Sequence, residues 1–311
     1  METVQLDRLL ERVEKPARYI GGEWNSIVKQ TAQLRFALCF PDVYEIGMSH
    51  LGSRILYNVL NAADGVACER VYAPWPDMEK ALREAGEPLF SLETKRPVGS
   101  FDILGFSLLY EMCYTNILTV LDLSGIPLYA KDRGEDAPLV IAGGPCCCNP
   151  APVAPFFDAI LIGDGEELVL EVASAVQEAK AAGTPKSALL KRLKALRGVY
   201  VPELHGAGET VVRRIVADLN AVPFTGKPVV PYMGIVHDRV ALEVMRGCTR
   251  GCRFCQAGYI YRPVRERKME SLMEAARKQV ACTGYDEVSL LSLSTGDYSE
   301  VHALVPEIIR E

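Results

Sequence analysis

Short apolar runs alternate with stretches of helical periodicity between residues 34 and 182. The runs at 34–40, 101–106, 139–142 and 159–162 predict strands, and the segments at 49–60, up to 121 and at 166–182 predict helices. Strands that alternate with helices indicate an α/β fold, in which a parallel, Rossmann-like sheet is covered by helices on both faces.

The flanking segments are less regular. Residues 1–30 predict a helical arm, and residues 183–235 predict a connector with a basic helix at 187–196 and a hairpin formed by 198–202 and 209–213. We therefore expect four parts: the arm at 1–30, the sheet domain at 31–182, the connector at 183–235 and a second domain at 236–311.

Polar residues and glycines follow the predicted strands of the sheet domain. They are Asp42, Ser107, Gly143, Gly144, Gly163 and Gly165. Ligands of parallel sheets bind beyond the carboxyl ends of the strands, and glycines allow close approach of a backbone to a ligand. These residues therefore form one candidate site, although ordinary tight strand-to-helix turns would have the same composition.

A second apolar run, at 240–245, predicts a strand that leads directly into three cysteines. Cys248, Cys252 and Cys255 have the spacing C-x-x-x-C-x-x-C, with glycines at 247 and 251 that let the backbone curl. Downstream, the pattern predicts a helix at 271–283 in which Ser271 and Glu274 form a capping box, a strand at 287–293 and a further helix from Ser299.

Thiolates that converge on one point select zinc or an iron–sulfur cluster over a hard cation. Structural zinc sites and most iron–sulfur sites use four protein ligands, but this loop supplies three. Three thiolates on a cubane of four irons leave one iron open to a small molecule. Zinc remains the alternative, with His237 or Cys282 as the fourth ligand.

Composition limits the partners and the cell compartment that we expect for this protein. The formal net charge is −6, which favours neither nucleic acid nor anionic membrane as a partner. The longest uncharged stretch, at 137–157, is broken by prolines and glycines, and the N-terminus is unlike a secretory signal. We therefore expect a cytoplasmic protein with reduced thiols, including a metal-free run at Cys146, Cys147 and Cys148.

The cysteine spacing, with Phe254 just before the last cysteine, resembles the radical S-adenosylmethionine (SAM) superfamily. The span from His237 to Pro263 resembles the subgroup that has an N-terminal cobalamin-binding-type domain. This resemblance implies a 4Fe–4S cluster on Cys248, Cys252 and Cys255, with SAM on the open iron. One electron, from a donor such as flavodoxin or ferredoxin, would split SAM to a 5′-deoxyadenosyl radical that attacks an unknown substrate.

The resemblance also suggests further contacts to the cofactors. Gly296 and Asp297 resemble the strand end that binds the amino group of SAM, and Phe254 would lie against SAM. The family's cobalamin ligand pattern, Asp-x-His-x-x-Gly, reads Asp42-Val-Tyr44-Glu-Ile-Gly47 here, so the axial histidine is absent. His50 is mis-spaced and is expected at a helix N-terminus on the surface. Either cobalamin binds without an imidazole, or the domain keeps the fold without the cofactor.

The second domain resembles the start of a partial TIM barrel of about six strand–helix units, of which residues 240–311 supply two. The resemblance therefore implies a C-terminally truncated radical SAM enzyme that is inactive as this chain alone. Its parent reaction would be cobalamin-linked methyl transfer or a modification of RNA or protein that needs no cobalt. The alternative from another class is a non-enzymatic zinc or iron–sulfur module.

Overall fold

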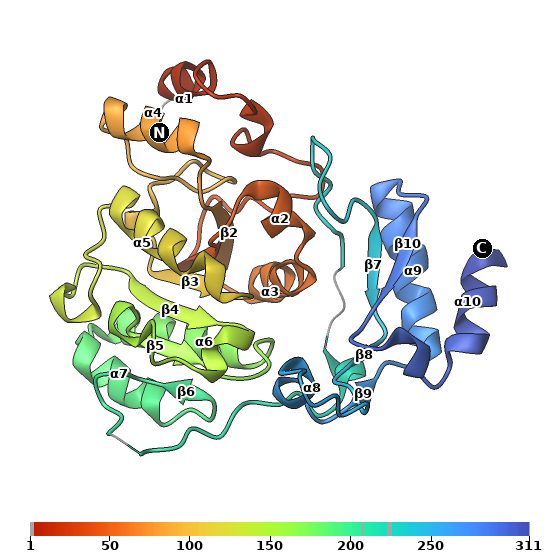
Figure 1. Cartoon of the computed structure of the whole chain (residues 1–311). Helices are drawn as coiled ribbons and strands as arrows, with labels where there is room; N and C mark the ends of the chain where they lie inside the picture. The colour runs from red at the N-terminus through yellow and green to blue at the C-terminus, as the bar shows by residue number, and fades with distance from the viewer. Residues whose placement is uncertain (1–2, 207, 223–225, 311) are drawn as a thin grey trace.

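Six strands form the larger of the sheets in the computed structural model, which describes residues 3–206, 208–222 and 226–310 (Figure 1). Their order is β2-β1-β3-β4-β5-β6, with β1–β5 parallel and β6 antiparallel at the edge. The strands are β1 (Leu34–Phe40), β2 (Val66–Tyr72), β3 (Ile103–Ser107), β4 (Leu139–Gly143), β5 (Ala159–Leu161) and β6 (Val199–Tyr200). The order 2-1-3-4-5 is that of a doubly wound sheet, whose topological switch point lies between β1 and β3.

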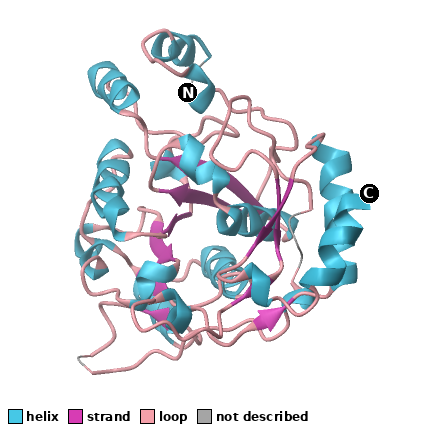
Figure 2. Ribbon diagram, turned by 45° about the vertical axis from the view of Figure 1, so that its right-hand side comes forward, coloured by secondary structure: helices cyan, strands magenta, loops and turns pink. Residues whose placement is uncertain are grey.

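Helices cover both faces of this sheet, as expected for parallel strands whose residues are apolar on both sides. The helices are α1 (Thr3–Leu10), α2 (Tyr44–Ser49), α3 (Leu51–Ala62), α4 (Pro76–Ala85), α5 (Tyr114–Leu123), α6 (Leu168–Ala182) and α7 (Lys186–Lys194). Figure 2 shows them outside the strands. The α/β fold and the parallel sheet predicted from the sequence are confirmed.

Alternate residues of each strand enter two separate hydrophobic cores. In β1, Phe36 and Leu38 join the core under α3, α6 and α7, whereas Ala37 and Cys39 join the core under α1, α4 and α5. This two-residue alternation is the pleat of a strand that is buried on both faces. The sheet is therefore fixed from both sides by apolar packing.

One strand, β2, and two helices, α2 and α4, of the sheet domain are absent from the sequence-based prediction. β2 pairs with β1 along its whole length, from Leu34 opposite Val66 to Phe40 opposite Tyr72. Its sequence, VACERVY, places Glu69 and Arg70 inside a strand, and this hides the apolar pattern. Both side chains are buried and paired, Arg70 with Glu23 and Glu93 and Glu69 with Arg35.

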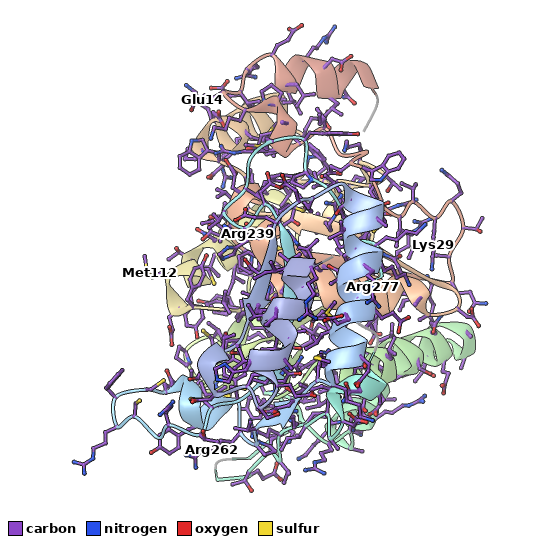
Figure 3. The ribbon with its side chains drawn as sticks, turned by 90° about the vertical axis from the view of Figure 1, so that its right-hand side faces the viewer. Glu14, Lys29, Met112, Arg239, Arg262 and Arg277 are labelled. Atoms are coloured by element: carbon purple, nitrogen blue, oxygen red, sulfur yellow. The ribbon has the colours of Figure 1, made fainter. Side chains whose placement is uncertain are left out.

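The C-terminal unit (residues 240–310) contains a β–α–β unit and a small hairpin. β7 (Val240–Glu243) and β10 (Val288–Leu291) are parallel, and β8 (Met245–Arg246) pairs antiparallel with β9 (Arg265–Glu266). The helices are α8 (Ala257–Ile260), α9 (Met269–Thr283) and α10 (Val301–Arg310). In Figure 1 this unit lies to the right of the larger sheet, and Figure 3 views it face on, with Arg277 of α9 labelled.

Two local predictions are wrong. The hairpin predicted at 198–202 and 209–213 does not form in the described part of that segment. Instead, β6 pairs with β5, and a bridge joins Gly163 to Arg214. Ser271 does not cap α9, which begins two residues earlier at Met269, after Lys268. Prolines and glycines mark where a segment turns, but the partner of a short strand is set by the rest of the sheet.

The N-terminal arm joins both parts of the molecule. Trp24 pairs with Val230 of the connector, and the Trp24 indole N–H donates to the carbonyl of Cys282 at 3.1 Å. The Asn25 amide donates to the same carbonyl and to that of Pro228. No described helix is long and apolar enough to span a membrane.

Candidate functional site

The cysteine loop (247–264) connects β8 to β9 and contains α8. β8 and β9 hold its two ends together, with Met245 opposite Glu266 and Arg246 opposite Arg265. Gly247 has a φ of +93°, and a Cβ there would lie 2.8 Å from the carbonyl oxygens of Tyr261 and Pro263. Only glycine fits this position, so the turn that leads into Cys248 depends on it.

The three cysteines of the loop are unpaired and accessible. Cys252 is exposed, and Cys248 and Cys255 are half-buried. Within the loop, the Cys255 N–H donates to the Cys252 carbonyl at 3.1 Å, and the Arg250 N–H contacts the Cys248 sulfur at 3.5 Å. The donor set of three free thiols in one glycine-containing loop fits a soft metal or an iron–sulfur cluster. Across the described residues, no three potential metal ligands are yet gathered around one point.

The side chains predicted to contact SAM lie around this loop. Phe254 is 92% exposed, so its ring is free to pack against a ligand. Gly296 and Asp297 belong to a 3₁₀ turn, Thr295–Asp297, that follows β10. The Asp297 carboxylate accepts from Arg250 Nε at 2.6 Å and from Ser294 Oγ at 2.7 Å. Arg250 therefore links the end of β10 to the cysteine loop.

The two residues considered as a fourth zinc ligand lie outside the cysteine loop, Cys282 in α9 and His237 before β7. The Cys282 thiol donates to the Gln279 carbonyl at 3.4 Å inside α9, and the His237 backbone N–H donates to Ser49 Oγ at 3.1 Å. Neither belongs to a ligand cluster with the loop thiols within the described ranges.

Two of the four cations between residues 262 and 268 are structural, whereas Arg262 and Lys268 are exposed. Cations at these positions would suit the SAM carboxylate, an anionic substrate or a solvated surface. Arg265 and Arg267 are instead buried: Arg265 pairs with Asp164, and Arg267 pairs with Glu243 at 3.5 Å. Arg262, labelled in Figure 3, donates to the Gly258 carbonyl at 2.9 Å and lies over the Tyr259 ring.

Arg246, two residues before Cys248, joins the loop to the larger sheet. Its guanidinium bonds Asp164 at 3.0 Å, Glu166 at 2.7 Å and Glu243 at 3.0 Å. Burial would raise the pKa of Asp164, but Arg246 and Arg265 together lower it below its ordinary value. Asp164 and Glu166 follow β5, so this ion-pair cluster fixes the start of the cysteine loop against the carboxyl end of the sheet.

A cavity of about 290 Å³ lies at this junction. It is bounded by the sheet face that packs on α3 and α6, by the turns after β3, β4 and β5, and by Glu243, Arg246 and Tyr261 of the C-terminal unit. Five of the residues predicted at the strand ends line it: Ser107, Gly143, Gly144, Gly163 and Gly165. The strand-end reasoning therefore identifies where the hollow lies.

Asp42, the sixth residue, is not part of the cavity wall. Its carboxylate accepts a hydrogen bond from the Tyr110 hydroxyl at 2.5 Å and from the Val43 N–H at 2.7 Å. At two of these positions, glycine is needed for a different reason from close approach to a ligand. A Cβ at Gly144 would lie 2.5 Å from the Leu108 carbonyl oxygen, and one at Gly163 would lie 2.1 Å from that of Arg214. These two glycines are needed for contact with the protein's own backbone.

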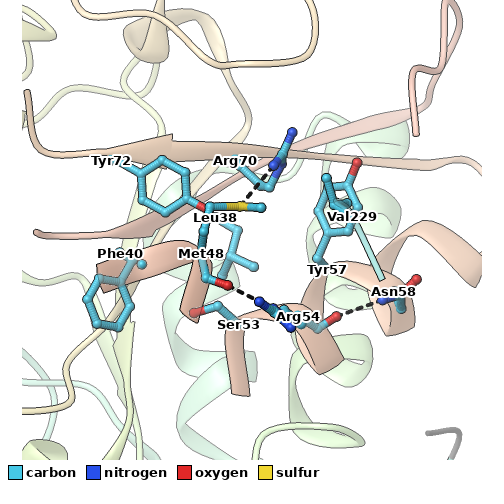
Figure 4. Close-up of a pocket in the computed structure, with 11 residues that line it drawn as sticks. Leu38, Phe40, Met48, Ser53, Arg54, Tyr57, Asn58, Arg70, Tyr72 and Val229 are labelled. Atoms are coloured by element: carbon cyan, nitrogen blue, oxygen red, sulfur yellow. Dashed lines mark hydrogen bonds between the residues drawn. The ribbon is translucent and has the colours of Figure 1, made fainter. Parts of the chain in front are cut away.

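The residues at the expected cobalamin site do not fit that cofactor. Tyr44, in place of the axial histidine, is 1% exposed, and its hydroxyl donates to buried Glu23 at 3.0 Å. The hollow beside α2, lined by Met48, Arg70 and Tyr72, has a volume of only about 20 Å³ (Figure 4). The larger cavity lies at the lower end of the range for small-molecule sites, roughly 300–1,000 Å³. A corrin ring with its nucleotide tail exceeds both spaces.

His50 also differs from its expected surface position. It caps α3, with Nδ1 accepting the Ser53 N–H at 3.2 Å, and its ring is half-buried against Phe40 at the cavity wall. Burial, with a smaller effect from Arg54, lowers the pKa of His50 to about 4. The ring is therefore neutral at physiological pH, and its proton lies on Nε2.

The sequence-based prediction missed the wall contributed from outside the sheet domain. Glu243, Arg246 and Tyr261 come from the C-terminal unit, and Arg213 comes from the connector. One sequence signal could have pointed to Arg246. It lies two residues before Cys248, so it must be close to any metal cluster that the loop holds. Its partners after β5 could not be identified without the tertiary arrangement.

Comparisons with known proteins relate this chain to one family model and to proteins of two organisms. Residues 52–202 match the family model described as radical SAM proteins, N-terminal. The chain is 27% identical over 270 residues to the uncharacterized protein MJ0966 of Methanocaldococcus jannaschii, covering 85% of this chain and 50% of that protein. It is 32% identical over 99 residues to tRNA-2-methylthio-N(6)-dimethylallyladenosine synthase of Porphyromonas gingivalis, covering 32% of this chain and 21% of the enzyme.

The chain thus spans half the length of the first relative and about a fifth of the second. The family match covers most of the sheet domain and the start of the connector, and the cysteine loop lies outside it. The family match shows that residues 52–202 are similar to the N-terminal part of radical SAM proteins.

Proposed function

We propose that this chain carries the cluster-binding part of a radical SAM enzyme. The observation that carries the proposal is the cysteine loop itself: three free thiols between β8 and β9, with Asp297 held against the loop by Arg250. A 4Fe–4S cluster with SAM would supply one-electron cleavage of SAM to a 5′-deoxyadenosyl radical. The family match to residues 52–202 supports this class of chemistry.

The chain's own residues have distinct roles in this proposal. Cys248, Cys252 and Cys255 would each give one thiolate, so that the protein leaves one metal position open. The Asp297 carboxylate is suited to the ammonium group of SAM, and the exposed Phe254 ring would shield the bound molecule from water. Arg246 would keep the loop in place against Asp164 and Glu166 during the reaction.

We further propose that the reaction modifies RNA or protein without cobalt. The relative named as a tRNA methylthio-adenosine synthase supports a nucleic-acid or related substrate. Cobalamin-linked methyl transfer is not favoured, because buried Tyr44 and the small cavity do not suit that cofactor. A flavodoxin or ferredoxin would supply the electron.

Anaerobic reconstitution with iron and sulfide tests the proposal. We expect about four irons per chain and an electron paramagnetic resonance spectrum that changes when SAM is added. Cys252→Ala should abolish cluster assembly, whereas Cys282→Ala and Cys148→Ala, which remove thiols outside the loop, should retain it. Each control therefore makes the same cysteine-to-alanine change as the test variant, but outside the cysteine loop.

A stoichiometric zinc content with no bound iron would instead establish the alternative, a non-enzymatic metal module. An iron content that is unchanged in Cys252→Ala would show that the ligands are assigned wrongly. A cluster whose spectrum ignores SAM would favour a structural or electron-transfer role.

A further inference from the structure

We propose that the cavity between the sheet and the cysteine loop binds a small organic acid with an apolar ring body. Nothing in the superfamily match assigns a ligand to this space. The inference does not depend on the cluster, because the cavity is bounded by the folded chain alone.

Size limits the ligand first. An apolar cavity of about 150 Å³ accommodates one benzene molecule. The cavity here measures about 290 Å³, which is enough for a fused two-ring compound with a short substituent. A complete corrin is larger than this volume.

The floor of the cavity determines the body of the ligand. It is formed by apolar side chains from both the sheet and its covering helices: Phe36, Leu38, Ile55, Leu56, Ile141, Leu161 and Val169. Gly105 of β3 presents no side chain on this face, and the Phe36 ring lies beside it. Burying a ring against such a surface is favourable in proportion to the apolar area removed from water.

The wall carries three carboxylates and two arginines, and of these Arg213 lacks a partner of opposite charge among the described residues. Arg246 is neutralised by Asp164, Glu166 and Glu243, and these carboxylates also pair with Arg265 and Arg267. Arg213 is different: it donates to the Ile260 carbonyl, but no carboxylate of the described residues pairs with it. A guanidinium in this position favours an anionic group, and a carboxylate matches its planar donor geometry.

Two neutral polar groups complete the site. His50 Nε2 and the Tyr261 hydroxyl both belong to residues of the wall, and neither is hydrogen-bonded to a described residue. His50 comes from the start of α3, and Tyr261 follows α8, so the two lie on different structural units. They would give a ligand one donor and one donor–acceptor in addition to Arg213.

The test compares two probes that share the same ring system, and it measures their binding by isothermal titration calorimetry. Indole-3-carboxylate carries the anion and indole does not. We expect both to bind the wild-type chain, with the acid tighter by about tenfold or more, as for a hydrogen bond to a charged group. Arg213→Gln should remove this difference while retaining indole binding, and Arg213→Lys should restore part of it.

A filling variant locates the binding. Leu56→Trp, which places a larger side chain in the cavity, should abolish binding of both probes, whereas Leu170→Trp, on α6 outside the cavity, should not. Circular dichroism would verify that each variant folds. Cys252→Ala should bind the acid as the wild type does, which separates this proposal from that of the cluster.

Four results would overturn the proposal. They are no binding of either probe to the folded wild type, binding that survives Leu56→Trp, equal affinity for acid and neutral probe, and tight binding of hydroxocobalamin.

Discussion

The strands of the larger sheet lie between two extended hydrophobic cores, whereas the cysteine loop has few buried residues around it. In β3, Ile103 and Leu104 are fully buried on opposite faces. In the loop, Cys252 is exposed and Phe254 is 92% exposed. One region is held by apolar packing, and the other is held mainly at its ends by β8, β9 and Arg246.

This difference shows where a cofactor would contribute to structure. Metal binding to a loop that is not preformed is coupled to the ordering of that loop. The sheet needs no such contribution, since its strands are paired and covered on both faces. Variants that disturb the sheet should therefore destabilise the chain with or without a cluster, and variants of the loop should be neutral until metal is present.

The largest effect is expected for Arg70→Met in β2. Arg70 bonds Glu23 at 2.7 Å and Glu93 at 2.6 Å, and all three side chains are buried. Removing the cation leaves two buried carboxylates uncompensated, which should lower the free energy of unfolding by about 3–5 kcal/mol. Urea unfolding followed by circular dichroism measures this, with exposed Leu293→Ala as the control that changes little. Equal midpoints for both variants would contradict the contrast between the regions.

Arg246→Met tests the connection between the two regions. Its guanidinium lies among Asp164, Glu166 and Glu243, and its side chain is 12% exposed. We expect a loss of about 2–4 kcal/mol in the free energy of unfolding, because three partly buried carboxylates lose their shared partner. Hydrogen exchange should also become faster in the cysteine loop but remain unchanged in β1 and β3. Uniform acceleration across the sheet would show that Arg246 supports the whole fold and not the junction.

The same contrast explains how much the sequence alone could predict. Strand β1 was predicted to the residue, because six of its seven residues are apolar and Arg35 stands near its start. The strands β3, β4 and β5 were predicted within one or two residues. β2 was missed because Glu69 and Arg70 interrupt its run, and their burial depends on partners distant in sequence. Local periodicity identifies apolar strands but does not identify buried ion pairs.

The candidate site was predictable only in part, for the same reason. The three cysteines and the strand-end glycines could be named from spacing. Tyr44 could be recognised as unsuitable for cobalt, but its bond to Glu23 could not be foreseen. The roles of Arg213 and Tyr261 in the cavity wall depend on the approach of the connector and the cysteine loop to the sheet.

His50, on the sheet side of the junction, should make the free energy of unfolding depend on pH, with an effect of intermediate size. Its pKa is about 4 in the folded chain, below its ordinary value of about 6.5, because the ring is removed from water. The unfolded chain therefore binds the proton first, so the stabilisation is complete above pH 6.5 and is lost as the pH falls toward 4. With partial screening by water, this amounts to about 2 kcal/mol.

The His50→Gln variant isolates this contribution. The amide can still accept from the Ser53 N–H but does not titrate, so the difference in unfolding midpoint between pH 7 and pH 5 should decrease relative to wild type. Urea unfolding at both pH values is the measurement. An identical pH dependence in the two proteins would show that other groups cause the acid sensitivity.

The smallest structural effect is expected on the loop side, at the Arg250–Asp297 pair. Both side chains are at the surface, and an exposed ion pair contributes little to stability, so Arg250→Gln and Asp297→Asn should leave the unfolding midpoint of the metal-free chain unchanged. After reconstitution of the cluster, the two variants should differ in their response to SAM. If Asp297 holds the ammonium of SAM, Asp297→Asn should raise the SAM concentration that gives half of the spectral change by about tenfold. Arg250→Gln, which frees the carboxylate, should not weaken it. Equal losses in the two variants would mean that the pair orders the loop and that Asp297 does not contact SAM.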